Sequence, residues 1–159
     1  MLKMRSVDVL KLAVVLLPAL LGGSVEAGEP GASLEPLLKA ADFEAIGVKG
    51  VVLAAPDAYD RVEQLGFERA SDSSMVAVLA RLEPTQPGQT LGSLVKAIAT
   101  DAAPVSGVGD EAYSYLAGVA FGFRKGKATF QLMSGFDGLS PFLSREQLAA
   151  LARTICSRL

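Results

Sequence analysis

Apolar side chains recur at helical spacing in three separate parts of the chain. Residues 34–46 predict one helix, and a second helix is expected to be capped by Thr90 and ended by Pro104. The third helix is expected to begin at Ser144, because Gln147 three residues later completes a capping box. The segments between these helices carry the strand signals.

Short apolar runs in the first half predict strands. Residues 48–54 indicate a buried strand, and the turn-rich residues 71–74 predict a hairpin between 67–70 and 75–82. Residues 57–65 fit either a helix or a strand. The run 75–82 is apolar on both faces, which is typical of a central strand. One of its faces is expected to carry Met75, Ala77, Leu79 and Arg81.

The last third predicts an antiparallel meander. Its strands are 112–116, 119–124 and 128–134, and Gly126 can adopt a positive φ in the tight turn Lys125–Lys127. Alternation places two apolar rows opposite each other, Phe121 and Phe123 facing Phe130 and Leu132. Together the elements predict an α+β fold. Its antiparallel sheet includes this C-terminal three-stranded meander, and its helices pack largely on one face.

Residues 1–27 have the pattern of a secretory signal peptide. A basic start precedes an uncharged apolar run over 12–23, and small residues suit cleavage after Ala27. The run is shorter than the roughly 20 residues that span a membrane. Cleaved export to the periplasm or cell exterior is therefore preferred over an uncleaved anchor or a cytoplasmic helix. No cysteine follows the run to accept a lipid, so no stable membrane insertion is expected after cleavage. The expected organisation is a signal peptide, a flexible leader at 28–33 and a single α+β domain at 34–159.

Composition restricts the chemistry that the chain can perform. Histidine is absent, which excludes Ser-His-Asp and Cys-His catalysis and histidine metal sites. After cleavage, 12 basic and 15 acidic residues remain without a basic cluster, so no nucleic-acid partner is expected. Cys156 is the single cysteine, which excludes a disulfide within the chain. It is expected to pack as a small hydrophobe, with an intermolecular disulfide or a redox thiol as alternatives.

Two polar motifs suggest chemistry that their spacing does not support. Residues 107–111 read Gly-Val-Gly-Asp-Glu, without the third glycine of a dinucleotide site, and predict a turn in which Asp110 caps local amides. Asp57, Asp60 and Glu63 share a face if their segment is helical, but they lack the spacing of a calcium loop. A solvated acidic face is the preferred interpretation. No catalytic residue, metal site or cofactor is expected.

Apolar side chains in the last third form a candidate contact surface. Phe136, Leu139 and Phe142 occur in a loop, where exposed apolar groups would indicate binding. Tyr113 and Tyr115, in the first strand of the meander, are added to this surface. The expected occupant is a small apolar ligand or an unknown protein.

Between Gly107 and Leu159 the chain contains three motifs: GVGDEAY at 107–113, RKGKATF at 124–130 and LAALARTICSRL at 148–159. This combination resembles uncharacterised exported and lipoprotein α+β domains of bacteria. The resemblance implies an exported α+β domain and assigns no functional residue. The leading hypothesis is an exported, soluble bacterial protein that acts as a non-enzymatic binding or interaction domain. The alternatives are a carboxylate-dependent hydrolase and a cell-envelope structural or accessory protein.

Overall fold

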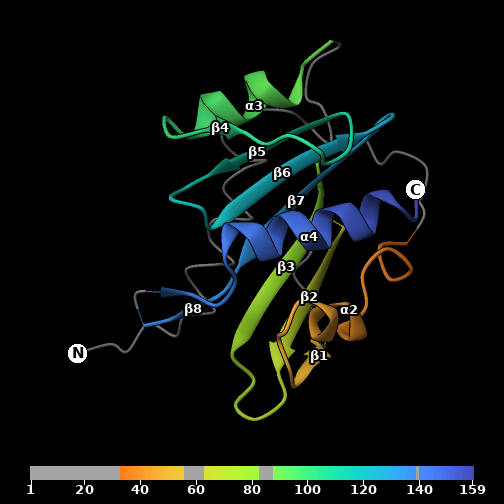
Figure 1. The fold of residues 1–159 in the computed structure, drawn as a ribbon, viewed down its shortest axis with the longest axis vertical. Coiled ribbons are helices and arrows are strands. Elements are labelled where there is room, and N and C mark those ends of the chain that lie inside the picture. The colour runs from red at the N-terminus through yellow and green to blue at the C-terminus, as the bar shows by residue number, and fades with distance from the viewer. Residues whose placement is uncertain (1–32, 56–62, 83–87, 139) are drawn as a thin grey trace.

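The structure is a computed structural model that describes residues 33–55, 63–82, 88–138 and 140–159. The expected signal peptide, most of the expected leader, residues 57–62 and Leu139 lie outside the described residues. Within the described residues, three helices accompany a seven-stranded antiparallel sheet and a two-stranded sheet (Figure 1). In chain order the elements are α2 (Ala40–Ala45), β1 (Val51–Leu53), β2 (Gln64–Arg69), β3 (Met75–Leu82), α3 (Leu91–Ile98), β4 (Ala103–Pro104), β5 (Glu111–Tyr115), β6 (Ala120–Lys125), β7 (Ala128–Ser134), β8 (Phe136–Asp137), β9 (Ser140–Pro141) and α4 (Arg145–Cys156). The predicted α+β fold is confirmed.

The large sheet has the strand order β1-β2-β3-β7-β6-β5-β4. The predicted central strand is confirmed, because β3 pairs with β2 on one side and with β7 on the other. The predicted hairpin across residues 71–74 joins β2 to β3. In the ambiguous segment, residues 64 and 65 belong to β2 and are therefore extended.

The C-terminal meander forms as predicted. Gly126 has a φ of +59° in the turn between β6 and β7. The register pairs Phe121 with Leu132 and Phe123 with Phe130. The rings of Phe123 and Phe130 stack with their centroids 5.4 Å apart. These cross-strand contacts fasten β6 to β7 on one face of the sheet.

Two hydrophobic clusters cover opposite faces of the sheet. The larger cluster packs α2 and α4 against Phe121, Phe123, Phe130 and Leu132, and Figure 1 shows α4 lying across that face. The smaller cluster packs α3 against residues such as Ala120 and Met133, which alternate with the first set along the same strands. Two of the three described helices therefore share a face, and α3 covers the other.

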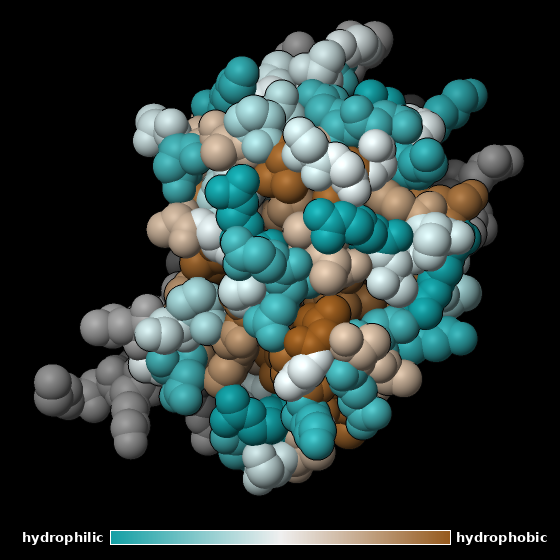
Figure 2. All heavy atoms as spheres, in the orientation of Figure 1, coloured by the Kyte–Doolittle hydropathy of each residue, from teal (hydrophilic) through white to brown (hydrophobic). Residues whose placement is uncertain are grey.

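The described surface leaves few large apolar side chains in water. The buried strand predicted over 48–54 is wrong in its burial, because β1 is an edge strand whose Val52 and Leu53 are 39% and 48% exposed. Leu159 is 52% exposed. Figure 2 shows hydrophobic atoms in scattered patches between hydrophilic side chains on the face in view.

The helix expected over 34–46 begins later than its apolar pattern suggests. Leu34 and Leu37 belong to a turn in which the Leu37 N–H donates to the Leu34 carbonyl at 2.9 Å. The helix starts where the Lys39 N–H donates to the Asp42 carboxylate at 2.8 Å. The leucines of the turn are still buried in the larger cluster. Burial, rather than helical geometry, explains their spacing.

The second helix ends earlier than expected. It stops at Ile98, because Ala99 adopts extended dihedrals. Pro104, expected to end the helix, lies instead in the edge strand β4, opposite Tyr113. A proline fits there because an edge strand leaves some N–H positions without a ladder partner.

The prediction of which β3 side chains share a face is wrong for the first residues of the strand. Phe67 pairs with Ala77 and Glu68 pairs with Met75, so Val76 is an extra residue in the ladder. Val76 and Ala77 both join the larger cluster, whereas Met75 packs against the smaller one. Such a bulge shifts the alternation by one residue, which a strict period of two does not reveal.

An ion pair ties the C-terminal end of the described chain to α2. The Arg158 guanidinium donates to both carboxylate oxygens of Asp42, at 2.6 and 2.7 Å, and to the Leu37 carbonyl at 2.9 Å. The Asp42 side chain is only 13% exposed. The Arg158 guanidinium beside it lowers the pKa of the Asp42 carboxyl.

We expect this pair to make stability depend on pH. A carboxyl with a lowered pKa stabilises the fold above its unfolded pKa of about 4, and this contribution is lost as the pH falls from there through the lower pKa of the folded state. Asp42→Asn should lower the free energy of unfolding at pH 7 by about 1–2 kcal/mol, with the difference disappearing at low pH. Urea unfolding between pH 2 and 7 measures this effect. Glu44→Gln, on the exposed side of the same helix, is the control, and equal pH profiles for the two variants would contradict the prediction.

Candidate binding site

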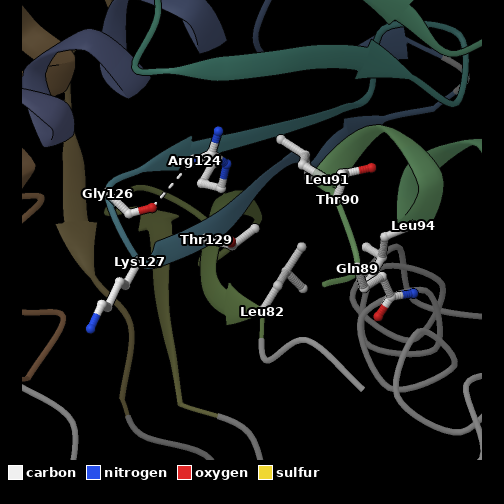
Figure 3. A pocket seen from close by; sticks show the side chains of 9 residues that line it. All are labelled: Leu82, Gln89, Thr90, Leu91, Leu94, Arg124, Gly126, Lys127 and Thr129. Carbon is white, nitrogen blue, oxygen red and sulfur yellow. Dashed lines mark hydrogen bonds between the residues drawn. The ribbon is translucent and has the colours of Figure 1, made fainter. Parts of the chain in front are cut away.

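A hollow of about 280 Å³ opens between the beginning of α3, the end of β3 and the β6–β7 hairpin (Figure 3). Leu82, Leu91 and Leu94 supply its apolar wall. Figure 3 shows Leu82 and Leu91 directed toward the middle, whereas Lys127 points outward from the rim. The polar part of the lining comes from Gln89, Thr90, Arg124, Lys127 and Thr129.

Sheet register explains why these side chains meet. Thr129 of β7 pairs with Leu82 of β3 on one side and with Arg124 of β6 on the other. Their three side chains form a row on the face covered by α3, because alternate residues of a strand share a face. The Thr90 hydroxyl accepts from the Ser93 N–H at 3.1 Å and so begins α3 beside this row.

Two carboxylates, Asp110 and Glu111, bind residues that line the hollow or adjoin its lining. Glu111 accepts from the Gly92 N–H at 3.0 Å and from Arg124 Nε at 3.5 Å, which links α3 to β6. Asp110 accepts from the Gly126 N–H at 2.7 Å and lies near Arg124 and Lys125. The hydrogen bond from the Gly126 amide is the main cause of the lowered pKa of Asp110.

The basic side chains of this region differ in their partners. Arg124 and Lys125 both pair with Asp110, and Arg124 also pairs with Glu111. Lys127 makes no ion pair with any residue in the described ranges. The rim of the hollow therefore carries positive charge that the described carboxylates do not fully neutralise.

The turn at 107–111 has the expected backbone but a different partner for its aspartate. Gly107 and Gly109 have φ values of +75° and +55°, as a glycine-punctuated turn requires. The sequence predicts that Asp110 caps local amides, but Asp110 binds the Gly126 amide sixteen residues away. Sequence spacing cannot reveal this contact, because the pairing of β5 with β6 creates it.

Other carboxylates also hold the backbone in place. Asp101 accepts from the amides of Leu116 and Ala117, where the backbone takes φ values of +52° and +55°. The hydrogen bond from the Ala117 amide is the main cause of the lowered pKa of Asp101, and the bond from the Leu116 amide adds to it. The hydrogen bond from the Ser74 hydroxyl is the main cause of the lowered pKa of Asp72. A general acid at neutral pH needs the opposite shift. Of the predicted acidic face, Glu63 is described, and it pairs with Arg81 at 2.8 Å.

The residues predicted as a contact surface do not form one site. Tyr113, Tyr115 and Phe136 pack with the smaller cluster, whereas Phe142 packs against the larger cluster on the other side of the sheet. Phe136 and Phe142 are half-buried, and the Arg69 guanidinium lies 4.5 Å from the centre of the Phe142 ring. Leu139, the fifth predicted residue, lies outside the described residues.

Tyr115 belongs to a buried polar pair. Gln131 Nε2 donates to the Tyr115 hydroxyl at 2.6 Å, and both side chains are 1% exposed. Burial raises the pKa of Tyr115, so the hydroxyl stays protonated. Gln131 Oε1 has no hydrogen-bond partner among the described residues. An unsatisfied buried carbonyl costs about 1–3 kcal/mol.

We expect the two residues to be more costly to replace singly than together. Tyr115→Phe leaves the buried Gln131 amide without its acceptor, and Gln131→Met leaves the buried tyrosine hydroxyl without its donor. Each single substitution should therefore lower the free energy of unfolding by about 1–3 kcal/mol. The double variant removes both polar groups and should be at least as stable as the parent. Urea unfolding of all four proteins measures the coupling. Additive losses in the double variant would refute the prediction.

Cys156 is half-buried against the larger cluster, which agrees with its predicted role as a small hydrophobe. Burial is the main cause of the raised pKa of its thiol, which disfavours the thiolate. The described residues contain no group of three or more metal-ligating side chains. Among the described helices, none has the length and hydrophobicity needed to cross a bilayer.

The hollow is not among the features that the sequence predicted. In the sequence, Leu91 and Leu94 belong to a helix stripe, Thr90 is a cap and Lys127 is part of a turn. The basic turn Lys125–Lys127 was the one signal, but its neighbour α3 becomes visible only in three dimensions. Comparisons with protein-family models, with curated proteins and with solved structures find no match to this chain.

Proposed function

We propose that this protein is an exported, non-enzymatic binding domain that holds a small molecule between α3 and the β6–β7 hairpin. The observation that carries the proposal is the mixed lining of the hollow, in which three leucines lie among hydroxyl and basic groups. Ligand sites are commonly concave, mostly apolar surfaces with a few polar groups that orient the ligand. The volume of about 280 Å³ suits a small ligand.

The behaviour of the carboxylates supports a binding role over hydrolysis. Asp110 and Asp101 hold backbone amides, and their pKa values are lowered, so they are ionised and engaged at neutral pH. Glu111 is bound to the α3 amide of Gly92 and to Arg124. These hydrogen bonds suit carboxylates that hold loops and strands in place better than carboxylates that donate protons in a reaction.

Export is supported by the pattern of residues 1–27, with its basic start and short apolar run. Mass spectrometry of the protein from its own host tests this part of the proposal. We expect an N-terminus at Gly28 in the exported fraction. An intact Met1 in the cytosol would contradict export.

Native mass spectrometry of the same material tests the binding role. The expected result is a bound small molecule that is absent from Thr129→Phe, because the larger side chain fills the hollow. Glu68→Phe is the matched control, since Glu68 lies in β2 and β3 separates that strand from β7. A bound molecule that persists in Thr129→Phe, or a parent protein that carries none, would contradict the proposed site.

A further inference from the structure

The hollow differs from an ordinary apolar depression in the charge of its lining. Among the residues that the structure describes, its charged lining residues are Arg124 and Lys127, and none of its described lining residues is acidic. Resting on the proposed binding function, we propose that the hollow takes a short, unbranched aliphatic carboxylate. The carboxylate lies at the rim beside Arg124 and Lys127, and the alkyl chain lies against the leucine wall.

The apolar wall and the volume determine the length of the ligand. Leu82 comes from the end of β3, and Leu91 and Leu94 come from the first turn of α3, so the wall spans two elements. A hollow of about 280 Å³ is near the lower limit for ligand pockets, which favours a short chain. An inorganic anion would leave the leucines in contact with water, whereas an alkyl chain covers them.

The polar side of the hollow favours an anion. Asp110 and Glu111 are bound by the amides of Gly126 and Gly92 and pair with Arg124, and neither lines the hollow. Lys127 has no ion-pair partner within the described ranges, and its flexible side chain at the rim can turn toward a bound carboxylate.

Hydroxyl groups complete the polar side. Thr90 lines the hollow at the beginning of α3, where its oxygen accepts from the Ser93 amide. Thr129 lies in the row between Leu82 and Arg124, at the boundary between the apolar and charged parts. A carboxylate is an acceptor of several hydrogen bonds, and it matches this set of donors better than an amine does.

Titration of the full chain with three six-carbon ligands tests the inference. Hexanoate, hexan-1-ol and hexylamine have the same chain and differ in the charge of the head group. Followed by amide NMR at pH 7, hexanoate should give saturable shifts at Leu82, Leu91 and Gly126. Hexan-1-ol should bind about tenfold more weakly, and hexylamine should give no saturable shift.

Charge variants of the hairpin separate a local contact from general attraction. Lys127→Gln should weaken hexanoate about threefold or more and leave hexan-1-ol unchanged. Lys125→Gln is the matched control, because Lys125 is exposed one residue before the turn glycine and does not line the hollow. Lys127→Glu should abolish hexanoate binding. Dispersion of the amide spectrum shows that each variant is folded.

The outcomes distinguish the ligand class from the proposed function. If hexan-1-ol binds as tightly as hexanoate, or hexylamine binds more tightly, the hollow binds ligands but the inference of an anion is overturned. Equal weakening by the two lysine variants would also overturn it. If none of the three ligands shifts the amides of the hollow, the carboxylate inference fails. Native mass spectrometry of the protein from its own host is a separate experiment. Whether a bound molecule is present there tests the proposed function independently.

Discussion

Replacing Gly135 with alanine is expected to lower the free energy of unfolding by about 3 kcal/mol or more. A Cβ at this position would overlap the carbonyl oxygen of Met75 and lie 3.2 Å from the Phe142 ring. The contact cannot relax cheaply, because the Gly135 N–H donates to the Val76 carbonyl at 2.7 Å and holds the two backbones together. Since Val76 is the extra residue of β3, the substitution also disturbs the bulge at the beginning of that strand.

Gly138→Ala is the matched control for Gly135→Ala. Gly138 has a φ of +62°, and a Cβ added there would meet no described atom within 4 Å, so alanine brings backbone strain without a clash. Its expected cost is about 1 kcal/mol. Urea unfolding monitored by circular dichroism measures both variants. Equal losses of unfolding free energy in the two variants would contradict the prediction. They would show that backbone conformation, and not the close approach to Met75, explains why position 135 needs glycine.

Phe123→Ala is expected to lower the free energy of unfolding by a similar amount, about 3–5 kcal/mol. The side chain is fully buried, stacks on Phe130, and has its ring centre 6.5 Å from that of Phe121. Alanine would leave a cavity beneath α4 on the face where that helix packs against β6 and β7. Surrounding side chains can fill such a space only partly.

Phe123→Leu keeps an apolar side chain at the same position and should cost clearly less than alanine does. The difference between the two variants in urea unfolding reports the cavity, because both remove the aromatic stacking on Phe130. A loss for Phe123→Ala no greater than that for Phe123→Leu would contradict the expected cavity.

Sequence patterns predicted those features that depend on neighbouring residues. The turn at Gly126, the caps at Thr90 and Ser144 and the apolar rows of the meander are all local signals, and the structure confirms them. The central position of β3 was also predictable, because its residues are apolar on both faces. These elements account for most of the sheet and for two of its helices.

Features that depend on distant contacts were not predictable. The bulge at Val76 arises from the pairing of β2 with β3, and the early leucines are drawn into a turn by burial against the sheet rather than by helical spacing. The hollow requires Leu82, Thr129 and Arg124 to align in one row beside α3. Their alignment follows from strand register, which no single segment encodes.

The pairing of β3 with β7 has a consequence for the route of folding. Each side of this pair is continuous in sequence, β1 to β3 on one side and β4 to β7 on the other. Most other strand pairs close short connections, whereas Ala77 meets Ser134 and Leu82 meets Thr129, roughly fifty residues away. The entropic cost of closing a long loop therefore falls mainly on the pairing of β3 with β7. At this pair the two halves of the sheet, each assembled from local contacts, must come together.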